Sequence, residues 1–174
     1  GSFSGQLINF LAALLLLIAF AMLSQRRILS LLYLFAWQGL VLALSTTIVA
    51  YTTGQQHLYY SAMLTLVLKA FVLPWLLHRL IIKLNIRWDV ETLINIPTTM
   101  LVGIGLVILA FNLAAPITEL ASTITRNALG IAMASVLLSF LMMITRRKAV
   151  TMVIGFLAME NGLFFAATSA TYGM

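Results

Sequence analysis

Long apolar runs separated by short polar segments follow one another along the whole chain. Each run approaches or exceeds the roughly 18 residues that mark a membrane-spanning helix. The pattern predicts an all-α, polytopic membrane helix bundle, with a single transmembrane domain over residues 1–174. The six predicted transmembrane helices are at about residues 5–23, 28–51, 58–83, 93–113, 127–144 and 149–172.

The polar segments between these runs are short. A turn is predicted at residues 52–57, followed by loops at residues 85–92 and 114–126. The last loop carries Pro116 and Glu119. None of these segments is long enough to form a domain of its own.

Composition excludes a water-soluble fold. The chain is 63% hydrophobic and only 8% charged, whereas soluble domains are about 45–50% apolar and about 25% charged. So few charges cannot cover a water-exposed surface, and the lipid bilayer is the expected surrounding.

The positive charges gather at alternate helix ends. If the six helices alternate in direction, only Lys69 and Arg126 lie away from one common side. Basic residues collect on the cytoplasmic side, so both chain ends are expected on the non-cytoplasmic side. This distribution accounts for the net charge of +6 without a nucleic-acid partner. The cations of the common side are Arg26, Arg27, Arg79, Lys83, Arg87, Arg146, Arg147 and Lys148.

Several kinds of chemistry find no support in the sequence. There is no cysteine, so disulfides and thiolate metal sites are excluded. The two histidines, His57 and His78, are far apart and have no metal-ligand spacing. No phosphate-binding loop, nucleophile elbow or dinucleotide fingerprint occurs. We therefore expect no cofactor, no metal and no catalytic residue, and we expect proton or ion handling instead.

Three polar residues lie at a similar depth in their predicted helices. Gln38, Lys69 and Glu160 are each roughly ten to twelve residues from the cations that end their helix. At about 1.5 Å per residue, each is roughly 15–18 Å inside, near the bilayer centre. Charged groups at this depth usually face a bundle interior or a hydrated path. The sequence therefore predicts a polar layer at mid-membrane.

Glu160 and Lys69 have two interpretations. A carboxylate at mid-bilayer costs roughly 2.5–3.5 kcal/mol on insertion scales, so it needs a reason. The two residues are either a structural ion pair, or separate groups bonded to neighbouring subunits, or they titrate during transport. In the last case Glu160 is the proton site and Lys69 is the charge that tunes it. The residues alone leave these alternatives open.

Thr65 and His78 accompany Lys69 in the same predicted helix. Thr65 is one turn before Lys69 and shares its face, while Pro74 leaves the carbonyl of Ala70 without its helical donor. Water or a second side chain can bind beside such a freed carbonyl. His78 lies about 180° round the helix from Lys69, and it is either an interfacial residue or an uptake-side proton carrier.

Gln38 and Asn161 are predicted to form hydrogen bonds between helices. Both are followed by Gly and Leu, and both follow a pair of arginines along an apolar run. This faint repeat makes the first two and the last two helices parallel copies of one hairpin. A strip of small residues opposite Glu160 is expected to pack against another helix. The strip comprises Gly155, Gly162, Ala166 and Ser169.

The last predicted helix is similar to one in the K subunit of respiratory complex I. Two arginines are followed by the run Met152-Val153-Ile154-Gly155 and then by Asn161, as in the second helix of that subunit. A glutamate of that helix belongs to the proton-conducting membrane arm. The usual glutamate aligns with Leu157, and Glu160 comes one turn later.

A more extensive resemblance is to component E of hydrogenase-4, a membrane subunit of the group 4 nickel–iron hydrogenases. The segment of residues 61–74, which ends in Lys69-Ala70-Phe71-Val72-Leu73-Pro74, resembles that family, and so does Met159-Glu160-Asn161-Gly162. The order of helices agrees over nearly the whole chain. The family typically has at least one further helix after the Met-Glu-Asn-Gly helix.

The resemblance implies a non-catalytic subunit of a larger oxidoreductase complex in a bacterial or archaeal cytoplasmic membrane. Glu160, Lys69 and His78 would serve proton translocation, with Gln38, Asn161 and Thr65 as supporting polar groups. The partners would be antiporter-like membrane subunits and a hydrogenase or complex-I-like peripheral module. The alternative is a scaffold that joins these parts and has no proton path. A free-standing small transporter is a third possibility, although no substrate-sized polar constellation is present.

Overall fold

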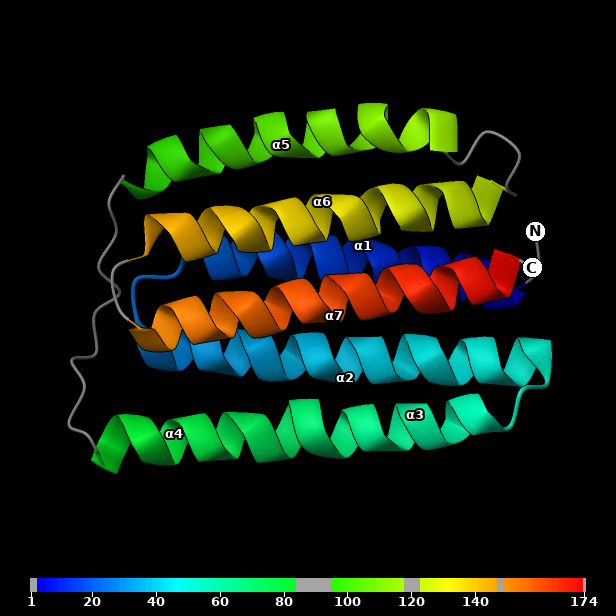
Figure 1. The fold of residues 1–174 in the computed structure, drawn as a ribbon, viewed down its shortest axis with the longest axis horizontal. Coiled ribbons are helices and arrows are strands. Elements are labelled where there is room, and N and C mark those ends of the chain that lie inside the picture. The colour runs from blue at the N-terminus through cyan, green and yellow to red at the C-terminus, as the bar shows by residue number, and fades with distance from the viewer. Residues whose placement is uncertain (1–2, 84–94, 118–122, 147–148, 174) are drawn as a thin grey trace.

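The computed structural model describes residues 3–83, 95–117, 123–146 and 149–173, and within them the chain is an all-α bundle. Six of its helices are long and apolar enough to cross a membrane, as the sequence predicts. The third crossing is a continuous rod built from α3, a π-helix (η1) and α4 (Figure 1). The elements are α1 Phe3–Ser24, α2 Ile28–Thr53, α3 His57–Thr65, η1 Leu66–Val72, α4 Leu73–Lys83, α5 Ile96–Ile117, α6 Thr123–Thr145 and α7 Ala149–Gly173.

Two connections differ from the predicted loops. The expected loop at residues 114–126 is wrong at both ends, because α5 continues to Ile117 with Pro116 inside its last turn and α6 already begins at Thr123. Membrane helices tolerate proline more readily than soluble ones. Residues 85–92 and Glu119 lie outside the described residues.

The helix α2 extends two residues into the predicted turn of residues 52–57, to Thr53, and Gly54 ends it. Its φ of 70° is left-handed, and its backbone N–H donates to the carbonyl of Ala50 at 3.0 Å. Glycine adopts this conformation without the steric cost of a Cβ, so it is suited to end a helix.

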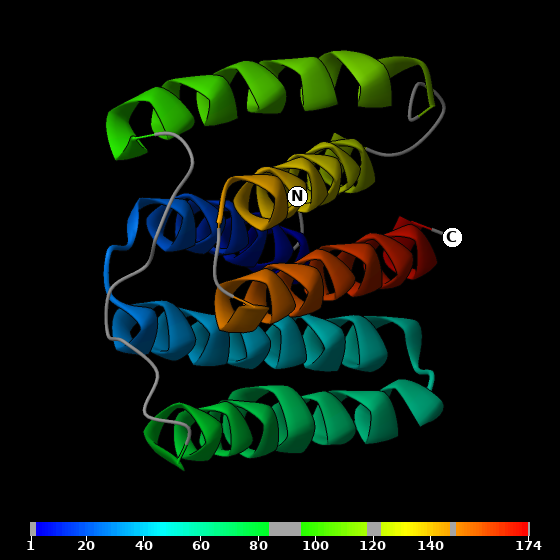
Figure 2. The ribbon, with the colours of Figure 1, turned by 60° about the vertical axis from the view of Figure 1, so that its left-hand side comes forward.

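Four helices form the inner bundle and two crossings flank it. In the apolar window of each helix, 56% of the residues are buried in α2 and α6, against 17% in the third crossing and 22% in α5. Figure 2 shows α5 on one side and the α3–α4 rod on the other, with the remaining helices between them. The core is filled by large side chains such as Phe35, Phe165 and Leu138.

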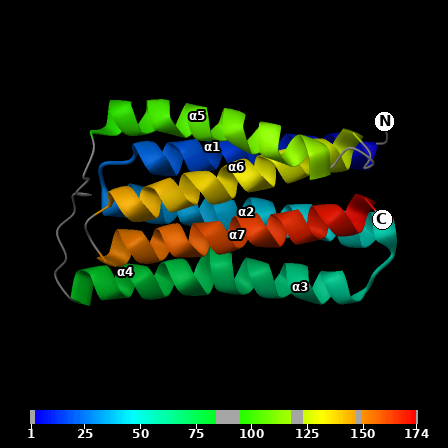
Figure 3. The same ribbon diagram turned by 45° about the horizontal axis from the view of Figure 1, so that its top comes forward.

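The two predicted hairpins, α1–α2 and α6–α7, lie side by side. The paired helices α1 with α6 and α2 with α7 are in contact, and α2 and α7 run in the same direction (Figure 3). The two hairpins are therefore parallel, as the faint repeat predicts. The structure adds that each helix of the first hairpin packs against its counterpart in the second.

The connections that carry cations gather at one end of the bundle. The α1–α2 turn with Arg26 and Arg27, the end of α4 and the end of α6 all lie at the left in Figure 1, and the N- and C-terminal ends lie at the right. Arg87, Arg147, Lys148 and the side chain of Arg126 lie outside the described residues. Six apolar helices with this distribution are compatible with a multi-pass membrane protein.

Arg146 is buried, although the charge pattern of the sequence groups it with the cations of the loops. Its side chain is 3% exposed, and its guanidinium donates to the carbonyl of Leu23 and, at 3.3 Å, to Thr145 Oγ1. Leu23 is in the last turn of α1, where carbonyls lack helical donors and the helix dipole favours a cation. Burial lowers the pKa of Arg146 from its usual value, yet a guanidinium stays charged.

Candidate functional site

Lys69 is at the centre of the π-helix Leu66–Val72, which interrupts the third crossing. The backbone N–H of Leu73 donates to the carbonyl of Leu68, five residues earlier. The next residue, Pro74, has no N–H and cannot continue a four-residue ladder to Ala70. A π-turn accommodates this loss by widening the helix, and such turns are frequent at functional sites.

Gly39 allows the widened turn to lie directly on α2. A Cβ at Gly39 would be 2.9 Å from the carbonyl carbon of Lys69 and 3.0 Å from its Cβ and its carbonyl oxygen. Real Cβ atoms essentially never approach other atoms so closely. Only glycine therefore fits here, and the backbone of Lys69 is fixed against the middle of α2.

The Lys69 ammonium reaches from this backbone to α7. Its Nζ is 3.4 Å from Glu160 Oε1, and it lies 4.9 Å from the ring centroid of Phe164, one turn further along α7. A carboxylate and an aromatic face both attract a cation. The structure thus answers a question that the sequence leaves open, because the two mid-membrane charges are in contact.

The two partners of this ion pair differ in exposure. The Lys69 side chain is 12% exposed, whereas the Glu160 side chain is 53% exposed at the middle of an apolar helix. Hydrocarbon cannot satisfy the free lone pairs of a carboxylate, and burial of such a group without partners is costly. Glu160 therefore needs water or a polar protein group on its open side.

Asn161 points the opposite way, into the bundle. Its Nδ2 donates to Gln38 Oε1 at 2.9 Å, and both side chains are 2% exposed. The predicted hydrogen bond between helices is confirmed, and it joins α2 to α7. Gln38 precedes Gly39 and Asn161 follows Glu160, so the neutral pair and the charged pair occupy the same level of the bundle.

Thr65 and His78 take different positions relative to this level. Thr65 is buried at the end of α3, one turn before Lys69. His78 is partly exposed in α4, nine residues beyond Lys69, which corresponds to about 13 Å along a helix. In the described part of the chain the imidazole makes no ion pair. Proton exchange between His78 and the ion pair would thus need intervening water.

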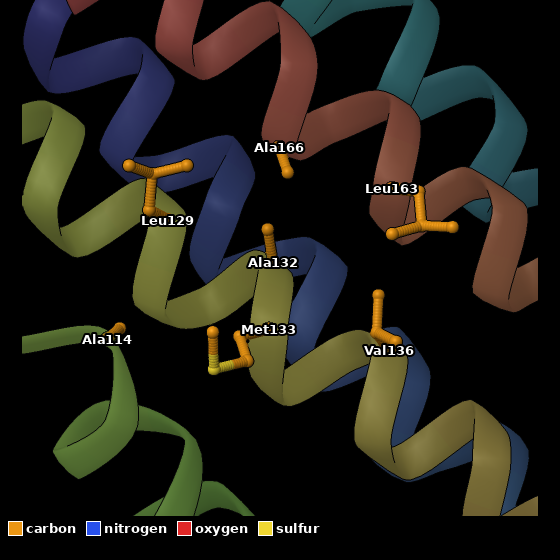
Figure 4. A pocket seen from close by; sticks show the side chains of 7 residues that line it. All are labelled: Ala114, Leu129, Ala132, Met133, Val136, Leu163 and Ala166. Atoms are coloured by element: carbon orange, nitrogen blue, oxygen red, sulfur yellow. The ribbon is translucent and has the colours of Figure 1, made fainter. Parts of the chain in front are cut away.

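The polar groups at this level are one carboxylate, one ammonium and two amides. Among the described residues, no three or more of His, Cys, Asp and Glu lie close enough to hold a metal ion. A cavity of about 280 Å³ at the junction of α5, α6 and α7 is lined by apolar side chains, among them Met133 and Leu163 (Figure 4). The lining that the structure describes contains no titratable side chain.

One curated protein is related to this chain over almost its full length. The uncharacterized protein Rv0085 of Mycobacterium tuberculosis is 31% identical over 169 residues, which are 97% of this chain and 77% of the relative. The chain belongs to the family of this mycobacterial protein. No family model matches the chain, and no solved structure matches it.

Two residues of the site, Gly39 and Phe164, are not identified from the sequence. Gly39 carries a usable signal, because a glycine follows the mid-helix amide in both halves of the repeat, at Gly39 and Gly162. Phe164 has none, since an aromatic residue in a membrane helix is unremarkable by itself. The two glycines of the predicted small-residue strip on α7 pack closely against α6: Cβ atoms at Gly155 and Gly162 would meet Met143 at 2.8 Å and Val136 at 2.9 Å.

Proposed function

We propose that this protein is a membrane-arm subunit of a complex-I-like or group 4 hydrogenase complex. It contributes ionisable residues to proton translocation, and the redox chemistry that drives translocation belongs to partner subunits. The observation that carries the proposal is the contact of Lys69 Nζ with Glu160 Oε1 at 3.4 Å, at the middle of two crossings, with Glu160 half exposed.

Glu160 is the proton-carrying group in this mechanism, and Lys69 is the charge that controls it. An opposite charge in contact with a carboxylate changes the affinity of that carboxylate for a proton. Separation of the two groups by even a few ångströms therefore couples movement to proton binding or release. The Lys69 side chain is a suitable moving part, since its backbone is held on Gly39 while its four-carbon stem is flexible.

The open side of Glu160 supports the presence of a membrane partner. A 53% exposed carboxylate is unsuited to lipid, and an antiporter-like subunit with a polar or hydrated face would satisfy it. On this proposal the end of the bundle that carries Arg26, Arg27 and Arg79 faces the cytoplasm of a bacterium or archaeon. His78, on the same half of the third crossing, would supply protons through water.

The experiment is proton pumping per electron in membranes that carry Glu160→Gln, with assembly of the complex checked on a native gel. Gln keeps the size of Glu but cannot release a proton, so we expect normal assembly and loss of pumping. The matched control is Phe156→Gln, because Phe156 is 49% exposed one turn before Glu160 on α7. It tests whether an amide on this face disturbs the complex by itself. Unchanged pumping in Glu160→Gln contradicts the proposal.

A scaffold role is the second candidate, and the enclosure of Lys69 favours it. Its backbone lies on Gly39, its ammonium contacts Glu160, and Phe164 covers it. If these contacts only fix α2, η1 and α7 together, Glu160→Gln and Lys69→Met will reduce the amount of assembled complex. The complex that does assemble would then pump normally.

A further inference from the structure

A small enclosed cavity lies at the centre of the inner bundle, on the side of α7 away from Glu160. Its volume is about 10 Å³, and residues of α1, α2, α6 and α7 line it. The polar members of the lining are Gln38, Ser135 and Asn161, and they are 2%, 4% and 2% exposed. A polar cavity this deep in an apolar bundle needs an explanation.

Two polar atoms of this lining have no hydrogen-bond partner among the described residues. They are Ser135 Oγ on α6 and Asn161 Oδ1 on α7. A buried polar atom without a partner is costly, and the great majority of such atoms in proteins are paired with protein or with ordered water. Asn161 Nδ2 is already used, since it donates to Gln38 Oε1.

We propose that this cavity binds one water molecule that bridges Ser135 Oγ and Asn161 Oδ1. The volume is that of about one water-sized probe, and the lining supplies the two or more polar partners that a buried water needs. Water can donate to the amide oxygen and exchange a hydrogen bond with the hydroxyl. Hard cations take about six or more oxygen ligands, usually with carboxylates among them, and this lining contains no carboxylate.

The bound water joins α6 to the amide pair of α2 and α7. It fixes the orientation of Asn161, and Asn161 is the residue next to Glu160. The water site does not depend on the proposed proton translocation, because it follows from the cavity and its unpaired atoms alone.

The test compares Ser135→Ala with Ser139→Ala in thermal unfolding of the purified protein. Ser139 is the matched control: it is one turn further along α6, it is 4% exposed, and its Oγ donates to the carbonyl of Ser135 at 2.8 Å within its own helix. If water bridges Ser135, its removal breaks a hydrogen bond between helices, and we expect the Tm to fall by about 2–4 °C relative to the unmodified protein. Ser139→Ala should change the Tm less, because the bond that it loses lies within one turn of its own helix. If no water is present, Ser135→Ala removes an unsatisfied hydroxyl, and an equal or higher Tm would overturn the proposal.

Two further measurements on the unmodified protein complete the test. A structure at a resolution that shows ordered water should place one density peak within hydrogen-bond distance of both Ser135 Oγ and Asn161 Oδ1, and a dry cavity would overturn the proposal. Replacement of sodium chloride by choline chloride should leave the Tm unchanged. A Tm that depends on sodium would identify a cation site instead and would equally overturn it.

Discussion

Glu160 and Asn161 are neighbours in the chain, yet they occupy opposite environments. Asn161 is buried in the bundle, and its amide is paired with Gln38 of the equivalent helix in the first hairpin. Glu160 is half exposed at the edge of the bundle and contacts a lysine of a flanking crossing. Neutral polar groups can be accommodated within one small bundle, because hydrogen bonds between helices supply partners and no charge has to be desolvated. A carboxylate needs more polar partners than an amide, and Glu160 lies where a second protein or water can supply them.

The charged side of this comparison depends on the close approach of η1 to α2. Gly39→Val would place side-chain atoms where the backbone of Lys69 lies, so we expect the free energy of unfolding to fall by about 3 kcal/mol. Denaturant unfolding of the purified protein measures this. The control is Gly105→Ala in α5, where nothing lies within 4 Å of the added Cβ, and a gain of about 0.5–1 kcal/mol is expected. Equal effects at the two glycines would contradict the packing described for Gly39.

The neutral side can be tested with a double-mutant cycle. Gln38→Leu leaves Asn161 Nδ2 without its acceptor, and Asn161→Leu leaves Gln38 Oε1 without its donor, so each should destabilise the protein by about 1–2 kcal/mol. Because the double variant leaves neither group unpaired, the coupling energy should lie between about 0.6 kcal/mol, the average for hydrogen bonds between membrane helices, and about 1.7 kcal/mol, the largest value found. Strictly additive losses would show that the two amides are not partners.

Much of this arrangement follows from the sequence. The six long apolar helices are predicted correctly, because hydropathy and length decide them directly. Counting residues from the cations at the helix ends places Gln38, Lys69 and Glu160 at one level, where the structure has them. The features that the sequence does not predict depend on packing between helices. Pro74 signals a lost hydrogen bond, but whether the helix kinks or widens into a π-turn depends on the space that Gly39 provides. From the sequence Arg146 is interpreted as a loop cation, because the sequence does not show that the end of α1 lies beside it.

Ser135 illustrates another limit of sequence reasoning. A serine in a membrane helix usually donates to a carbonyl of its own helix, as Ser139 and Thr145 do here. No local pattern distinguishes the serine whose hydroxyl faces a cavity. The difference appears only when four helices are placed around it.

The most direct test of the central claim is infrared difference spectroscopy of the assembled complex during turnover. The carboxyl stretching region reports whether an individual carboxylate gains or loses a proton, and subtraction of the Glu160→Gln spectrum assigns the band. If Glu160 carries the proton, a carboxyl band should change with turnover in the unmodified complex and be missing from the variant. Identical difference spectra for the two complexes would contradict the account and leave the Lys69–Glu160 contact a structural ion pair.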